Sequence, residues 1–101
     1  MIKHVLLLGF SPEYQGEKLK ETIADLQRRF AALAADMKQD GVVSVELGQN
    51  LGGGEYDLAL ISLFTDETAL KRYQAHPIHR EVKEQMNRYV VCRACVDYQI
   101  L

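Results

Sequence analysis

The sequence predicts a single α+β domain whose elements follow the order β-α-β-β-α-β. Four short runs rich in aliphatic residues have the length and the flanking turn residues of strands. One long segment between the first two runs carries a single apolar stripe at helical spacing, as expected of a helix packed on a sheet. Two of the four runs are apolar on both faces, so we place them in the middle of the sheet.

The first strand and the first helix occupy the N-terminal 40 residues. The strand is predicted over residues 2–10, and it ends before a Ser-Pro pair that favours a turn. A helix follows from about Glu13 or Glu17 to Lys38, and an Asp-Gly pair marks its end. Its apolar residues recur at steps of three and four and form one stripe. These residues are Leu19, Ile23, Leu26, Phe30, Leu33 and Met37.

The next two strands differ in their apolar patterns. The second strand, over residues 42–48, alternates between apolar and polar residues, which is typical of a half-exposed strand. We expect its apolar side chains to face the core: Val43, Val45 and Leu47. Residues 49–54 form a glycine-rich loop. The third strand, over residues 55–65, is apolar on both faces, so we expect it to be central.

A proline divides the second helical segment. Asp66 is a natural N-cap, and the helix that it begins reaches about Ala75. His76 precedes Pro77 and is therefore biased away from helical backbone angles. Pro77 then opens a further helix, which ends at about Asn87. The residues that we expect to face inward from this helix are Ile78, Val82 and Met86.

The last strand is predicted over about residues 89–100 and contains both cysteines. We expect Val90, Cys92, Ala94, Val96, Tyr98 and Ile100 on one side of it. Cys92 and Cys95 form a C-x-x-C spacing, but residues three apart in a strand point to opposite faces. That geometry suits neither a shared metal nor a disulfide, so we interpret both as small apolar side chains.

This element order is that of the ferredoxin-like fold, a four-stranded antiparallel sheet whose first and third strands are central. Two helical segments can cover only one face of such a sheet. The other face keeps large aliphatic side chains, and a monomer rarely exposes such a patch. We therefore predict a homodimer in which two copies pack sheet to sheet over roughly 800 Å² per partner.

Length and charge narrow the class of protein. The 101 residues predict one domain over residues 1–101. The net charge of −2 and the lack of a lysine-arginine run argue against nucleic acid as a partner. The longest apolar run near the start is too short for a membrane span and lacks the features of a signal peptide, so we expect no membrane partner and a cytoplasmic location. The glycine triplet at residues 52–54 precedes a strand rather than a helix, and we expect no cofactor.

The polar residues around the proline are the candidates for proton chemistry. An imidazole with its ordinary pKa of about 6.5 exchanges protons near neutral pH, so His79 beside the Tyr73 phenol could enolise a carbonyl compound. Three interpretations stay open: His76 and His79 bond the backbone groups freed at the break, they contact a ligand, or they take part in catalysis. His4, on an apolar strand face, is either a satisfied core residue or a pocket residue. These three histidines come from separate elements, and we expect no metal site.

Several blocks of the sequence resemble the stress-responsive A/B barrel (Dabb) family. They are residues 2–10, residues 41–48, residues 56–58, the stretch from Tyr73 to His79 with its H-P-x-H motif, and residues 96–98. The blocks occur in the family's order and cover nearly the whole chain. The resemblance implies a dimeric α/β barrel, in which two ferredoxin-like sheets close on each other, and a role related to stress.

The resemblance also extends distantly to a plant member of the family, olivetolic acid cyclase, which closes a polyketide chain by an aldol-type step. Tyr73 and His79 match its catalytic tyrosine and histidine, and His4 matches a histidine of its first strand. Leu58 stands where the cyclase has another pocket histidine, so this pocket is less polar. The resemblance thus implies catalytic roles for Tyr73 and His79. The implied ligand-binding residues are His4, His76, Tyr56 and Leu58.

Two functions remain as alternatives. The first is a small dimeric protein that binds a hydrophobic or carbonyl metabolite between sheet and helices. The second is a cofactor-independent enzyme, similar to a polyketide cyclase or an isomerase, with His79 as general base and Tyr73 as its polar partner. A cavity reached by both side chains favours ligand handling, whereas bonds from both to the backbone would exclude the enzyme.

Overall fold

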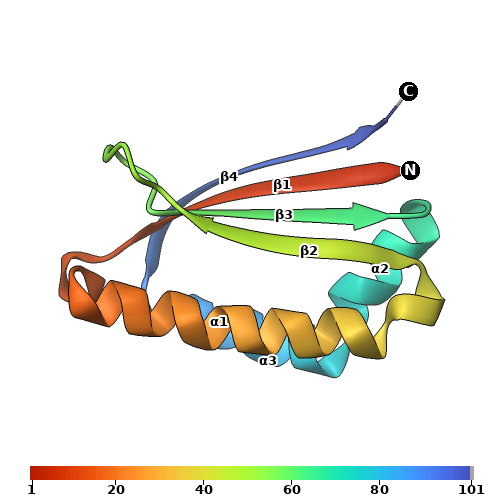
Figure 1. The fold of residues 1–101 in the computed structure, drawn as a ribbon, viewed down its shortest axis with the longest axis horizontal. Coiled ribbons are helices and arrows are strands. Elements are labelled where there is room, and N and C mark those ends of the chain that lie inside the picture. The colour runs from red at the N-terminus through yellow and green to blue at the C-terminus, as the bar shows by residue number, and fades with distance from the viewer. Residues whose placement is uncertain (101) are drawn as a thin grey trace.

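The computed structural model describes residues 1–100 as a four-stranded sheet with helices on one of its faces (Figure 1). The strands are β1 (Ile2–Phe10), β2 (Val42–Gln49), β3 (Leu58–Phe64) and β4 (Val90–Gln99). The α-helices are α1 (Glu17–Asp36), α2 (Glu67–Ala75) and α3 (Pro77–Met86), and two short 3-10 turns, η1 (Pro12–Tyr14) and η2 (Lys38–Asp40), flank α1. The predicted order is confirmed, with the second helical segment divided in two. None of the helices in this range has the length and apolarity to span a membrane.

The sheet has the strand order β2-β3-β1-β4, and all neighbouring strands are antiparallel. The structure therefore confirms that β1 and β3 are central, as their two apolar faces predicted. The register places His4 of β1 between Ser62 of β3 and Asp97 of β4. Because directly paired residues point to the same face of a sheet, this row lies on one side.

The core lies between α1 and the helix-covered face of the sheet. All six residues of the predicted apolar stripe are buried, from Leu19 to Met37. They form one continuous cluster with strand residues such as Leu8, Leu58 and Phe64, each at most 1% exposed. The stripe that was visible in the sequence thus determines which side of α1 faces the sheet.

Two shifts of register correct predicted side-chain directions. In β2 the register shifts between Val42 and Ser44, so Val42 faces the core and Val43, which we expected there, is 47% exposed. In β4 a second shift pairs Val90 with Phe10, which turns Val90 to the helix-covered face instead of the side of Cys92. A bulge inserts one extra residue and reverses the alternation beyond it, and strict alternation cannot predict it.

The break between α2 and α3 is built as predicted, except at one residue. Asp66 caps α2 by accepting a backbone N–H at 2.8 Å. His76 is extended (φ −61°, ψ 136°), and its Nδ1 accepts the N–H of Ile78 at 3.1 Å, while Pro77 takes the first helical position. Ile78 was expected inward but is 38% exposed, because His79 takes the inward position in the first turn of α3.

Within residues 1–100, no helix lies over the other face of the sheet (Figure 1). The register places mainly apolar side chains there: Val5, Leu7, Ala59, Ile61, Leu63, Ala94, Val96 and Tyr98. Within one chain this face remains open, and Val96 is 59% exposed. Cys92, opposite Gly9, lies on this open face, whereas Cys95, opposite Leu6, lies on the helix-covered face. The predicted divergence of the two cysteines is therefore confirmed.

A substitution at Gly41 tests how closely β2 and α2 approach each other. Gly41 has a left-handed backbone (φ 96°), and an added Cβ would lie 2.5 Å from Thr65 Oγ1 and 2.6 Å from Ala69 Cβ. We expect Gly41→Ala to lower the free energy of unfolding by about 2–4 kcal/mol in urea denaturation, because backbone strain and overpacking add. The control is Gly53→Ala (φ 74°), which meets nothing within 4 Å and should cost only about 1–2 kcal/mol. Equal losses of unfolding free energy in Gly41→Ala and Gly53→Ala would contradict the clash at Gly41.

Candidate functional site

A cavity of about 330 Å³ lies between the helix-covered face of the sheet and the helices α2 and α3. Leu6, Phe30 and Leu60 contribute to its apolar wall. Its polar lining includes His4, Tyr73, His79, Lys83, Arg93 and Cys95. The cavity is partly open to solvent, so a small molecule has a route into it.

The helix break brings Tyr73 and His79 together in this cavity. Tyr73 lies in the last turn of α2 and His79 in the first turn of α3, and their ring centroids are 4.7 Å apart at an interplanar angle of 59°. Phe64 of β3 holds the other side of the tyrosine ring, with centroids 5.1 Å apart. The structure thus places the two predicted catalytic residues side by side, and their chemical role stays a prediction.

The Tyr73 hydroxyl is buried without a hydrogen bond. The residue is 1% exposed, and neither its Oη nor the neighbouring Ser62 Oγ has a partner in the described structure. Burial raises the pKa of Tyr73 well above its usual value, and the nearby Ser62 hydroxyl opposes this only weakly. The two hydroxyls are close enough to influence each other, but their geometry does not meet that of a hydrogen bond. Tyr73 is therefore a neutral phenol whose hydroxyl makes no hydrogen bond of normal geometry in the described structure.

His79 is neutral at physiological pH. Burial and then electrostatic repulsion by Lys83 lower its pKa to about 4, with a smaller effect from the nearby His4 ring, and a contact with the Gln74 backbone carbonyl opposes the shift. Its Nδ1 is buried and makes no hydrogen bond in the described structure. A contact between His79 and the Gln74 carbonyl at the end of α2 does affect its pKa, so the interpretation that His79 bonds freed backbone groups stays a prediction.

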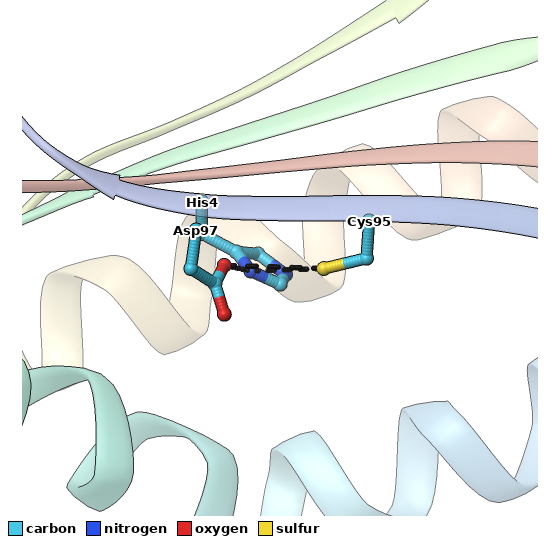
Figure 2. A network of polar contacts seen from close by, with 3 residues as sticks. All are labelled: His4, Cys95 and Asp97. Carbon is cyan, nitrogen blue, oxygen red and sulfur yellow. Dashed lines mark hydrogen bonds and ion pairs between the residues drawn. The ribbon is translucent and has the colours of Figure 1, made fainter.

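His4 lies on the floor of the cavity, next to β4. It is 9% exposed, and its Nδ1 makes a short hydrogen bond with Oδ1 of Asp97. Cys95 Sγ approaches the same nitrogen at 3.6 Å (Figure 2). Sequence reasoning missed Asp97 and Cys95 because they lie more than 90 residues from His4. The pairing of the first and last strands is the signal that would have placed them on its face.

Three predicted ligand-binding residues lie outside this cavity. His76 bonds Asp36 on α1 at 2.9 Å and caps α3, so its contacts are structural. Tyr56 precedes β3, and Leu58 pairs with Leu8 one step along the sheet from the cavity wall. Binding by these three residues stays a prediction that this cavity does not support.

Two cations near the cavity were not found by sequence reasoning. Lys83 on α3 and Arg93 on β4 both line it, and Arg93 is held by Asn87 Oδ1 at 3.0 Å. Their positive charge favours a ligand whose polar end is partly or fully negative. Lys83 also adds to the effect of burial in lowering the pKa of His79.

Comparisons with known proteins agree with this architecture. A family model, the stress responsive A/B barrel domain, matches residues 2–100. A dimeric protein of unknown function from Bacteroides fragilis has a TM-score of 0.85 at 26% identity, covering 98% of this chain and 95% of its own. A dimeric ferredoxin-like protein from Thermobifida fusca shares the fold with a TM-score of 0.80 at 22% identity, covering 98% of this chain and 90% of its own. A protein from Arabidopsis thaliana shares it with a TM-score of 0.77 at 24% identity, covering 100% of this chain and 96% of its own. A comparison with curated proteins gave no match.

The lowered pKa of His79 predicts a pH-dependent stability. The folded chain holds this pKa at about 4 against an ordinary value of 6.5, so the unfolded chain binds more protons between these values. Stability should therefore be lost as the pH falls from 6.5 towards 4. Allowing for partial solvent screening, we expect a loss of about 2 kcal/mol from this group. Urea denaturation across this range should show the extra loss in the wild type and not in His79→Gln; parallel curves would contradict it.

Proposed function

The chain belongs to the stress responsive A/B barrel domain family, whose model spans residues 2–100, and from this premise we propose a function for its cavity. The protein is a homodimer that binds a small hydrophobic metabolite with a carbonyl group between its sheet and its helices. In the cell, we propose that this protein takes part in a response to stress.

The observation that carries this proposal is a pair of unpartnered polar atoms in one cavity. Tyr73 Oη and His79 Nδ1 are both buried, both lack a hydrogen bond in the described structure, and both residues line the same space. A buried polar group without a partner costs about 1–3 kcal/mol. Such groups are rare in folded proteins and call for an explanation. A ligand that bonds both atoms supplies one.

The lining indicates the chemistry of this ligand. The Tyr73 phenol donates a hydrogen bond to a carbonyl oxygen, and a neutral His79 nitrogen accepts one from an enol or hydroxyl group. Phe30 and Leu60 provide apolar contact for the body of the molecule. Lys83 adds attraction for a partly negative oxygen. A hydrophobic compound with a carbonyl, enol or carboxylate end fits all four features.

An enzymatic function is the alternative, and the contact of the two rings is the observation that favours it. His79 would remove a proton next to a carbonyl that Tyr73 polarises, as in a cyclase or an isomerase. General bases work best when their pKa lies near the working pH. The pKa of His79, at about 4, makes it a weak base in the free protein and favours binding over catalysis.

The open face of the sheet supports the homodimer. It carries apolar side chains from three strands, and Val96 and Tyr98 are 59% and 44% exposed in a single chain. The Bacteroides relative with this fold is described as dimeric. A second copy packed on this face would remove the apolar surface from water and form a barrel from two sheets.

A cytoplasmic location is part of the same proposal. Cys92 and Cys95 are both free, on opposite faces of β4. Free thiols persist in reducing compartments, whereas disulfides are typical of oxidising ones. The two cysteines therefore fit an intracellular protein.

Ligand binding is tested by thermal shift with acetophenone and benzoylacetone as probes. We expect a stabilisation that grows with concentration in the wild type and is reduced at least about tenfold in apparent affinity in Tyr73→Phe and His79→Gln. Without a probe, Tyr73→Phe should be more stable by about 1 kcal/mol, because it removes an unpaired hydroxyl. Tyr89→Phe is the control, since Tyr89 packs on Tyr14 in a different groove.

A shift that is unchanged in both cavity variants would place the ligand elsewhere and contradict the proposal. The enzyme alternative is separated with the same samples. Exchange of the acetophenone methyl hydrogens for deuterium, followed by nuclear magnetic resonance, would be accelerated by wild type and not by His79→Gln if the cavity performs enolisation. Binding without exchange supports the metabolite-binding function.

The homodimer is tested by light scattering at micromolar concentration. We expect twice the chain mass of 11.5 kDa for the wild type. Val96→Glu puts a charge on the open face that we propose as the interface and should shift the protein to the monomer mass, because an unpaired buried charge is costly. Ala31→Glu, on the exposed side of α1, is the control and should leave the mass unchanged. A wild-type monomer would contradict the dimer.

A further inference from the structure

Three side chains of types that can bind a metal ion converge where β1 and β4 pair. His4 lies opposite Asp97 in the register, and Leu6 lies opposite Cys95, so the three side chains share the helix-covered face. One ligand atom from each of His4, Cys95 and Asp97 lies within 4.8 Å of the others. Figure 2 shows Cys95 and Asp97 extending from β4 on either side of the His4 ring.

The atoms at this point are those of a zinc site. Thiolate sulfur, imidazole nitrogen and carboxylate oxygen are the three protein ligands of Zn²⁺, at about 2.3, 2.0 and 2.0–2.2 Å from the ion. Ligand atoms around a tetrahedral ion at these lengths are about 3.3–3.6 Å apart. Cys95 Sγ lies 3.6 Å from His4 Nδ1 and 3.9 Å from Asp97 Oδ1. The first of these distances is the separation that such an ion requires, and the second is about 0.3 Å longer than the required range.

The third pair of ligand atoms, on His4 and Asp97, must move slightly apart, and the structure permits this. His4 Nδ1 and Asp97 Oδ1 are in direct hydrogen-bond contact, which is closer than two ligands of one ion. The Asp97 side chain is 41% exposed and lies in an edge strand, so rotation about its χ angles can open this contact. His4, at 9% exposure, is the fixed ligand, and the two residues of β4 are the adjustable ones.

The cluster is also poorly satisfied by protons alone. Cys95 and Asp97 both approach the same nitrogen of His4, which can share at most one proton with them. A divalent cation would neutralise the carboxylate and the thiolate together.

We infer that His4 Nδ1, Cys95 Sγ and Asp97 Oδ1 bind one Zn²⁺ ion per chain. Three protein ligands leave the fourth tetrahedral position to a water molecule or to another ligand, as in open zinc sites. His4 and Cys95 line the Tyr73–His79 cavity, and Asp97 lines the neighbouring groove, so this position lies where the two meet. This proposal differs from our expectation of no metal site, which considered the three histidines and the pair of cysteines separately.

The test uses untagged, reduced full-length protein with Zn²⁺ and with Co²⁺ as a coloured substitute. We expect calorimetric titration with Zn²⁺ to give one ion per chain, and Co²⁺ to produce a thiolate-to-metal charge-transfer band in the near ultraviolet. Cys95→Ser should abolish the band and weaken Zn²⁺ binding more than about 100-fold, since even residues behind the ligands contribute about 10–100-fold. Asp97→Asn should weaken binding and keep the band.

Cys92→Ser is the matched control, because Cys92 lies in the same strand on the opposite face of the sheet. It should retain the band and the affinity of the wild type. Absence of saturable Zn²⁺ binding at micromolar concentration would overturn the inference. So would a band that survives in Cys95→Ser or disappears in Cys92→Ser. Because the readout is metal binding, the result is independent of whether the cavity binds a carbonyl compound.

Discussion

The helix break at His76 and Pro77 is the constraint on which the cavity depends. On an uninterrupted helix, the side chains of residues six apart point about 120° away from each other around the axis, so Tyr73 and His79 would point to different faces. The extended backbone of His76 redirects the chain, and the two rings meet at 4.7 Å. Bonds from His76 to Asp36 and to the start of α3 hold this geometry. The first histidine of the motif thus positions the second.

Burial of the apolar core compensates for the polar atoms of the cavity that make no hydrogen bond in the described structure. Ser62 Oγ, Tyr73 Oη and His79 Nδ1 are buried without partners, at a cost of about 1–3 kcal/mol each. The apolar stripe of α1 is buried along its whole length against the same face of the sheet. Complete burial of a large aliphatic side chain contributes about 1.5–3 kcal/mol, so this core can tolerate a polar defect. The apolar contacts of α1 thus stabilise the fold, whereas the polar groups of the cavity include residues of α2 and α3.

Local patterns in the sequence predicted most of the fold. What they could not predict depends on the pairing of strands that lie far apart in the sequence. Helix periodicity, the Asp66 cap and the proline break depend on near neighbours, and the structure confirms them. Val43 was assigned to the core wrongly, because one inserted residue reverses alternation without leaving a local signal. Tyr73, His79 and His4 do line one cavity, whereas Asp97 and Cys95 needed the register of strands at opposite ends of the chain.

That register therefore decides which chemistry the cavity has. A shift of β4 by one residue would turn Cys95 and Asp97 to the open face and bring Val96 under the helices. Gly9 helps to fix it, because a Cβ there would lie 2.3 Å from Cys92 Sγ and 2.5 Å from the carbonyl oxygen of Glu55. A larger residue would force β4 away at the point where its pairing with β1 becomes irregular. The small size of Gly9 on the open face is thus compatible with the register that places Cys95 and Asp97 beside His4 on the covered face.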